Sequence, residues 1–166
     1  MFRTGDAVIH PAEGVCRITE IAEKNFGGTA EKYYVLKSVY DGQSTVYIPV
    51  ESVKVCPKIR LALSKEQVQD IIDSLENSEP VKSDNDNHRR QIFKEILASG
   101  DTAEISRVLT TVHQLKKDIR KSGRKMKVSD ERIIKETERS VFMEFAFSLG
   151  ISPEEIPAYI DDRINN

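Results

Sequence analysis

Basic side chains are concentrated in one part of this 166-residue chain. Residues 88–127 contain eleven Lys or Arg and four Asp or Glu, a local net charge of +7 in a chain whose formal net charge is −2. Cations grouped in this way neutralise phosphates and release counterions, so the segment predicts contact with nucleic acid. The residues expected to make this contact are His88, Arg89, Arg90, Lys94, Lys116, Lys117, Arg120, Lys121, Arg124 and Lys125.

The densest basic stretch is KKDIRKSGRKMK, at residues 116–127. Cations at the end of a helix also interact favourably with the negative end of its dipole, but this explains only about two or three of them. The segment has neither stacking aromatic residues nor a recognition helix rich in Asn, Gln and Arg. We therefore expect contact mainly with the nucleic-acid backbone and with weak sequence specificity.

The chain has none of the residue patterns of familiar catalytic sites. A phosphate-binding Gly loop, an H-E-x-x-H pair and a nucleophile elbow are all missing. His10, His88 and His113 are far apart in the sequence, so each is expected to be a surface or capping residue. Cys16 and Cys56 lie outside any C-x-x-C motif and are expected to be reduced thiols. We expect no catalysis, no metal and no cofactor.

The composition is typical of a charged cytoplasmic protein, with 39% hydrophobic and 31% charged residues. No apolar run approaches the roughly 20 residues that a membrane helix needs. The first residues also lack the basic, apolar and small-residue order of a signal peptide. These observations predict a cytoplasmic location without a membrane contact.

Residues 1–60 have the pattern of short β-strands separated by turns. The strand candidates are AVIH, GVCRITEIA with Val15, Ile18 and Ile21 as its apolar positions, KYYVLKSVY, QSTVYIP and ESVKV. Turns with Gly, Pro or Asp separate them, and NFGGT is expected to be the tip of a hairpin. About five short strands at this spacing predict a small SH3-like or Tudor-like β barrel.

From Ser64 onward the apolar residues recur at helical spacing. Ser64 and Gln67 predict a capping box at the start of the first helix, and a polar linker follows at residues 77–87. Three further helices are expected. One ends at Gly100, the next begins at Asp101 and Glu104 and ends at Gly123, and the third begins at Ser129 and ends at Gly150. A last helix is expected to start near Pro153 or Pro157. The prediction is an α+β two-domain protein, with a β barrel at 1–60 and an all-α helical bundle at 61–166.

The opening residues MFRTGDAVIHPAEGVCRITEI resemble the start of the CarD/CdnL family of bacterial transcription regulators. The matching residues are Phe2, Gly5, Asp6, Val8, Pro11 and Gly14, with His10 where Tyr is common in the family. EKYYVLK (31–37) and TVYIPVESV (45–53) resemble the middle strands of the family. RR…ILASGD (89–101) and VSDERIIKETERSVFMEFA (128–146) resemble its helical segments, so the resemblance covers nearly the whole chain.

The resemblance implies that the β module binds the β subunit of RNA polymerase. In the family a strand edge of this module pairs with a strand of the polymerase, which is β-augmentation. The matching edge is roughly residues 44–48, and Lys24 and Tyr47 stand where the family usually has a contacting Arg. The polymerase-binding residues expected on this basis are Lys24, Ser44, Thr45, Val46, Tyr47, Ile48 and Pro49.

The resemblance also implies that the helical domain touches promoter DNA just upstream of the melted region. A Trp of the family wedges into the minor groove there, but this chain has no Trp and places Asp86 or a neighbour at that position. The interpretation is a monomeric regulator that binds the polymerase β subunit, contacts the promoter DNA backbone and modulates the stability of the open complex. The alternative is an adaptor that docks on the polymerase without DNA contact, which the missing Trp favours.

Overall fold

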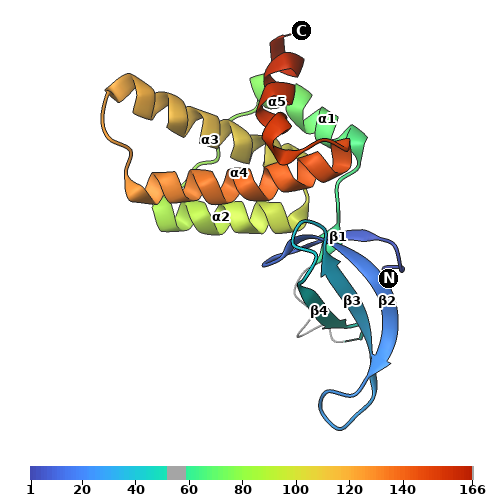
Figure 1. Ribbon diagram of the computed structural model, residues 1–166. Helices are drawn as coiled ribbons and strands as arrows, with labels where there is room; N and C mark the ends of the chain where they lie inside the picture. Colours follow the sequence, from blue (N-terminus) through green and yellow to red (C-terminus); the bar gives the residue numbers. More distant parts are fainter. Residues whose placement is uncertain (52–58, 166) are drawn as a thin grey trace. The chain divides into compact units, whose positions relative to one another are not determined.

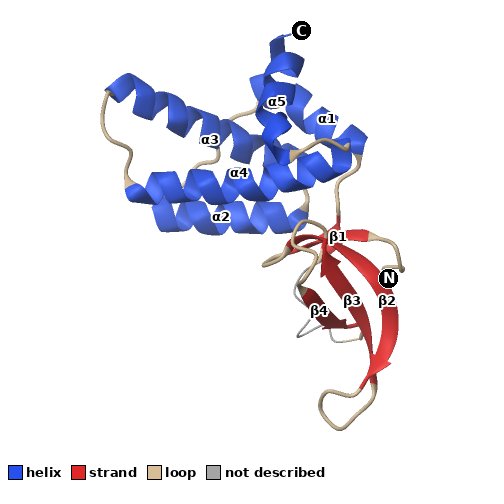
Figure 2. Ribbon diagram, viewed as in Figure 1, coloured by secondary structure: helices blue, strands red, loops and turns tan. Residues whose placement is uncertain are grey.

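The computed structural model describes residues 1–51 and 59–165. Within these residues the protein is α+β, with one five-stranded antiparallel sheet and five α-helices (Figures 1 and 2). The chain divides into two compact units, Met1–Ala62 and Leu63–Asn166. The predicted α+β class is confirmed, whereas the assignment of separate roles to 1–60 and 61–166 stays a prediction.

The first unit, Met1–Ala62, consists of the sheet and its turns. Its strands are β1 (Ala7–His10), β2 (Gly14–Lys24), β3 (Glu31–Ser38), β4 (Thr45–Pro49) and β5 (Arg60–Leu61). Their order in the sheet is β4-β3-β2-β1-β5, and each neighbouring pair is antiparallel. Because β4 and β5 are the two ends of this order, the predicted closed barrel is not confirmed for the described residues.

The strand prediction was incomplete at the end of the first unit. The predicted strand ESVKV falls mostly on residues 52–58, outside the described residues. The fifth strand is β5, which pairs with β1 through Val8↔Leu61 and Ile9↔Arg60. A two-residue strand is too short to show a period of two, so nothing in the local sequence could have indicated it.

A β-bulge changes the burial of β2. The register with β3 shifts between Ile18 and Glu20, so that one extra residue is inserted on β2. Ile18 is fully buried with Leu36 in the core of this unit, but Ile21 is 40% exposed. Of the three apolar positions named for this strand, Val15 and Ile18 are therefore buried, and Ile21 is not. Cys16 is a buried free thiol, and Cys56 lies outside the described residues.

The second unit, Leu63–Asn166, is helical. Its α-helices are α1 (Lys65–Asp73), α2 (Asp86–Ser99), α3 (Thr102–Ser122), α4 (Val128–Leu149) and α5 (Ile156–Asn165), with two 3₁₀ turns, η1 (Leu75–Asn77) and η2 (Pro153–Glu155). Apolar side chains from every helix form its core, among them Val68, Phe93, Ile105, Phe145 and Ile156. Unlike the sheet, this unit matches the predicted periodicity closely.

The helix ends show why the prediction succeeded there. Ser64 and Gln67 form the predicted capping box of α1. Asp101 accepts the Glu104 N–H at 3.1 Å and caps α3. α2 ends at Gly100, which has a positive φ of 72°, a conformation that glycine adopts without strain. These are local signals, and the tertiary structure preserves them.

The helix α4 starts at Val128, one residue before the predicted boundary Ser129. The N-cap is Lys127, which makes no side-chain capping bond, and Ser129 already lies within the first turn of the helix. The Ser129 hydroxyl donates instead to Asp86 Oδ2 at 3.0 Å, which connects the first turns of α4 and α2. The Ser129 hydroxyl therefore makes a tertiary bond rather than a cap of its own helix.

The first residue of the helical unit is held by α4. The Leu63 N–H donates to Glu144 Oε1 at 3.0 Å, and the Ser148 hydroxyl donates to the Leu63 carbonyl at 2.6 Å. Leu63 and Glu144 are 6% and 5% exposed, so the carboxylate bond lies in the core. Both polar groups of one buried peptide position are thereby satisfied, as buried backbone requires.

Candidate functional site

The predicted polymerase-binding strand is β4, an edge of the sheet. It pairs with β3 on one side, and no other described strand pairs with it. Val46 and Ile48 face the core of the unit, whereas Thr45 and Tyr47 are exposed, so the side chains alternate between two faces. Ser44 precedes the strand, and its hydroxyl donates to Glu13 Oε2 at 2.8 Å.

The backbone N–H and C=O groups of successive β4 residues point alternately toward β3 and away from it. Val50 N–H bonds to the Lys32 carbonyl, and Ser38 N–H bonds to the Ser44 carbonyl. Antiparallel pairs alternate between bonded and non-bonded, so the backbone groups of Val46 and Ile48 face β3. The N–H and C=O groups of Thr45 and Tyr47 therefore point away from β3. Pro49 has no N–H to offer.

Lys24 lies on β2, two strands away from β4. Its register partner is Glu31 on β3, and its ammonium lies 3.9 Å from the Glu20 carboxylate. The pairs Glu20↔Val35 and Val35↔Tyr47 place Lys24, by alternation, on the same face of the sheet as Tyr47. We call this face, opposite to the core, the outer face. The structure thus brings the two predicted contact positions to one face but leaves Lys24 off the edge strand.

Three aromatic rings cluster on the outer face. The Phe26 centroid lies 5.1 Å from that of Tyr33 and 5.1 Å from that of Tyr47, both in edge-to-face geometry. Phe26 is 62% exposed and Tyr47 43% exposed in spite of these contacts. We call Phe26, Tyr33 and Tyr47 the aromatic patch. Sequence reasoning missed Phe26, although a large apolar residue in the Gly-rich NFGGT tip was a visible signal.

The predicted DNA-contacting residues of α2 already have acidic partners. Arg89 lies 3.1 Å from Asp86 and 3.9 Å from Asp130, and its side chain is 19% exposed. Arg90 Nε lies 3.9 Å from Glu136 Oε2. Hydrogen bonding from Arg132, aided by the nearby charges of Arg132, Arg90 and Lys94, lowers the pKa of Glu136. The guanidinium groups of Arg89 and Arg90 therefore already serve the packing of α2 against α4.

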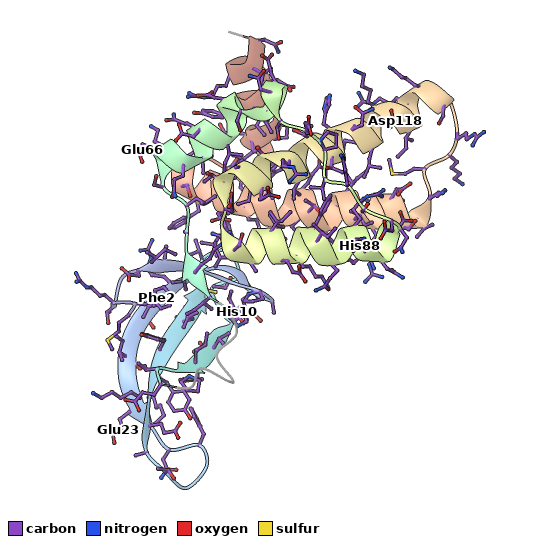
Figure 3. All side chains as sticks on the ribbon, turned by 180° about the vertical axis from the view of Figure 1, so that it is seen from behind. Phe2, His10, Glu23, Glu66, His88 and Asp118 are labelled. Carbon is purple, nitrogen blue, oxygen red and sulfur yellow. The ribbon has the colours of Figure 1, made fainter. Side chains whose placement is uncertain are left out.

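His88 and Lys94 are the more exposed members of the predicted α2 set. His88 caps the residues before the helix, since its Nδ1 accepts the Asp84 N–H at 3.2 Å. His10 in the first unit is similar: its buried Nδ1 accepts the N–H groups of Ala12 and Glu13, and burial lowers its pKa. The prediction of capping roles is confirmed for both (both are labelled in Figure 3).

The predicted residues of α3 are the most accessible cations. Lys116 pairs with Glu138 of α4. Five others are exposed, and none of them forms an ion pair with another residue in the described part of the chain: Lys117, Arg120, Lys121, Arg124 and Lys125. We call these five residues the basic turn, because they span the end of α3 and the connection to α4.

The basic turn and the α2 residues lie at the same end of the helical unit. The C-terminal end of α3 and the N-terminal ends of α2 and α4 all point toward it, although α3 diverges there from the other two helices; Asp118 on α3 and His88 on α2 are labelled in Figure 3. The bond between Ser129 and Asp86 fixes two of these ends together. The two parts of the basic set, which are separated in sequence, thus lie toward the same end of the unit on diverging helices.

Metal clusters and membrane-spanning helices are both absent from the described residues. In residues 1–51 and 59–165 no group of three or more His, Cys, Asp or Glu is arranged to hold a metal. Among the helices of the described residues, none has the length and apolar character that spanning a bilayer requires. The exposed edge β4, the aromatic patch and the basic turn are therefore the features to interpret.

Comparison with known families assigns both units. Residues 2–61 match the CarD-like/TRCF RID domain. Residues 70–161 match the CarD C-terminal domain. No curated protein matched the sequence. The chain therefore belongs to the CarD-like family, whose domains indicate a non-enzymatic transcription factor that interacts with RNA polymerase.

Proposed function

We propose that this protein binds the β subunit of RNA polymerase through β4, contacts the promoter DNA backbone through the basic turn, and changes the stability of the open complex. We further propose that it acts as a monomer in the bacterial cytoplasm without a cofactor, with a Tudor-like barrel module and a separate helical domain. The single observation that carries the DNA contact is the basic turn, with five exposed cations and no ion pair to another described residue.

The polymerase contact is supported by the edge character of β4. No other described strand pairs with β4, so the outward N–H groups of Thr45 and Tyr47 are the ones that a strand of another protein would meet. Strand addition uses such main-chain groups for affinity and side chains for register. The remaining predicted contact residues follow from this: Val46 and Ile48 support the strand from the core, and Ser44 and Pro49 flank it.

The DNA contact is supported by charge and accessibility. If each of the five cations of the basic turn neutralises one phosphate, they contribute about −4 to −5 to the slope of log affinity against log salt. Lys116, Arg89 and Arg90 contribute less, because acidic side chains of the protein already lie beside them. Such a contact positions the protein on the duplex without reading its sequence.

The experiment measures the lifetime of the open complex that cognate polymerase forms on a linear promoter, with and without the protein. The test variant changes the five basic-turn residues to Gln. The control variant removes five positive charges from other exposed positions of the helical unit: Lys65, Lys82, Arg132, Lys135 and Arg139. Both variants have the same net charge. The control also breaks the exposed ion pairs Arg132–Glu136 and Lys135–Glu131, each worth at most about 1 kcal/mol, so a thermal melt of both variants checks that folding is intact.

We expect the protein to change the lifetime, the control to retain most of this effect, and the basic-turn variant to lose it. The salt slope of binding to the promoter complex should be shallower for the basic-turn variant by up to about 4. Equal effects of the two variants would show that only total charge matters, and the DNA contact would be wrong.

The second candidate function is an adaptor that docks on the polymerase without DNA contact. It is favoured by the ion pairs that occupy Arg89 and Arg90 and by the absence of Trp. An unchanged open-complex lifetime in spite of measured polymerase binding would select this candidate.

A further inference from the structure

The aromatic patch is placed where a partner of β4 would meet it. Tyr47 belongs to both features: its backbone points outward from the sheet edge, and its ring lies on the outer face beside Phe26. A residue directly opposite on an added strand would place its Cβ about 4.5–5.5 Å from the Cβ of Tyr47, on the same face. Its side chain would therefore lie against the aromatic patch.

The hairpin tip holds Phe26 in this position. The Asn25 side-chain oxygen accepts the Gly28 N–H at 2.9 Å, and Gly28 has a positive φ of 91°. Asn and Gly are the residues that favour such a turn, since Asn bonds to backbone two or three residues on and Gly tolerates positive φ. The turn brings Phe26 within ring contact of both Tyr33 and Tyr47. These ring contacts restrict the position of Phe26, and such preorganisation reduces the entropy lost on binding.

The chemistry of the surrounding residues favours an uncharged partner. Lys24 is the nearest predicted cationic contact on the outer face, and it lies beside the carboxylate of Glu20 in the same strand. Tyr47 itself is neutral, where the family usually has Arg. Lys37, which pairs with Thr45, is a further exposed cation of the outer face, but the surface around Tyr47 is aromatic. An aliphatic or aromatic side chain is the group that gains most by covering that part.

We propose that Phe26 and Tyr47, supported by Tyr33, form a specificity-determining contact for one apolar side chain on the polymerase β-subunit strand that pairs with β4. This inference rests on the proposed function and adds to it a residue, Phe26, and a chemical class of contact. Ordered aromatic residues that retain exposed surface are typical hot spots of protein interfaces. The contact replaces the charged interaction that Arg makes at the equivalent family positions.

The test measures the affinity of the full-length chain for cognate core polymerase without DNA, at low and at high salt. Phe26→Ser and Tyr47→Thr each remove one ring from the patch. Thr45→Pro removes one outward N–H of β4 and leaves all three rings, and proline is tolerated at such an edge position. Leu61→Ser is the matched control, because Leu61 is 56% exposed on β5 at the other edge of the sheet.

We expect Phe26→Ser and Tyr47→Thr each to weaken binding at least about tenfold, as removal of a hot spot does, at both salt concentrations. Leu61→Ser should bind like the wild type. A thermal melt of each variant checks that folding is intact, and the exposure of Phe26 makes Phe26→Ser the decisive substitution.

The outcomes separate the inference from the proposed function. If the wild-type chain does not bind polymerase, both are overturned. If Thr45→Pro weakens binding while Phe26→Ser and Tyr47→Thr bind like the wild type, strand addition stands and the aromatic contact is wrong. A loss on ring removal that disappears at high salt would also overturn the inference, because it would show a contact dependent on charge.

Discussion

Replacing Glu144 with Leu tests whether a buried carboxylate fixes the start of the helical unit. Glu144 is 5% exposed and accepts the Leu63 N–H at 3.0 Å. Leu is of similar size and more hydrophobic, so a calculation from apolar burial alone predicts a more stable protein. The hydrogen bond predicts the opposite, because Leu63 is itself buried and its N–H would lose its acceptor.

The expected change in the free energy of unfolding follows from the buried Leu63 N–H, which Glu144→Leu leaves without an acceptor. A buried donor without a partner costs about 1–3 kcal/mol, and a hydrogen bond to a charged group contributes about 1.5–3 kcal/mol. We therefore expect Glu144→Leu to lower the free energy of unfolding by about 2 kcal/mol after its gain in apolar burial. Glu144→Gln retains an oxygen that can accept the Leu63 N–H, so it should be less harmful than Glu144→Leu.

The assay is urea unfolding followed by circular dichroism, with the m-value checked for constancy. The control is Glu131→Gln, which removes one charge from α4 at an exposed position whose ion pair with Lys135 is worth at most about 1 kcal/mol. A double-mutant cycle with Ser148→Ala should show coupling, since both side chains hold Leu63. If Glu144→Leu is as stable as the wild type or more so, the carboxylate does not stabilise the Leu63 peptide and the reasoning is refuted.

Three further predictions concern local features. Gly100→Ala should destabilise the protein by about 1 kcal/mol in urea unfolding, because Gly100 has a φ of 72° at the end of α2; an unchanged midpoint would contradict it. The hydrogen bond from Arg163 lowers the pKa of Asp73 below its usual 3.8. The stability that this pair contributes is therefore present above pH 3.8 and is lost as the pH falls through the lowered pKa. Arg163→Gln should raise the Asp73 pKa in a carboxyl NMR titration, and an unmoved pKa would refute the pairing. Burial raises the pKa of the Cys16 thiol to about 11. Cys16 should therefore resist alkylation by iodoacetamide at pH 8 until the protein unfolds, as measured by peptide mass spectrometry. Rapid labelling of the native protein would contradict this.

The helical unit was more predictable than the sheet because its signals are local. The capping box of Ser64 and Gln67 and the end of α2 at Gly100 each depend on residues within one helical turn. The bulge near Ile18 and the two-residue strand β5 depend on pairing with distant strands. No short window of sequence contains that information, which is why neither the exposure of Ile21 nor the strand β5 was expected.

The candidate site was also only partly predictable, because it too depends on contacts between distant segments of the chain. The sequence places a cluster of cations in residues 88–127, but it does not show which ones the fold has already paired. Arg89 and Arg90 belong to this cluster and yet lie beside Asp86 and Glu136. The aromatic patch likewise needs three segments to meet, the hairpin tip, β3 and β4. The family resemblance identified Tyr47, but only the structure relates it to Phe26.

The two proposed surfaces use different physical interactions, and salt should separate them. The contact at β4 combines main-chain hydrogen bonds with an aromatic surface, neither of which depends on displaced counterions. The basic turn relies on counterion release, so its contribution falls steeply as salt rises. Raising the salt should therefore weaken the DNA contact while the protein stays on the polymerase. The open-complex effect should then disappear at a salt concentration at which polymerase binding persists. If both are lost together in the wild type, one surface makes both contacts and the division of function between the two units is wrong.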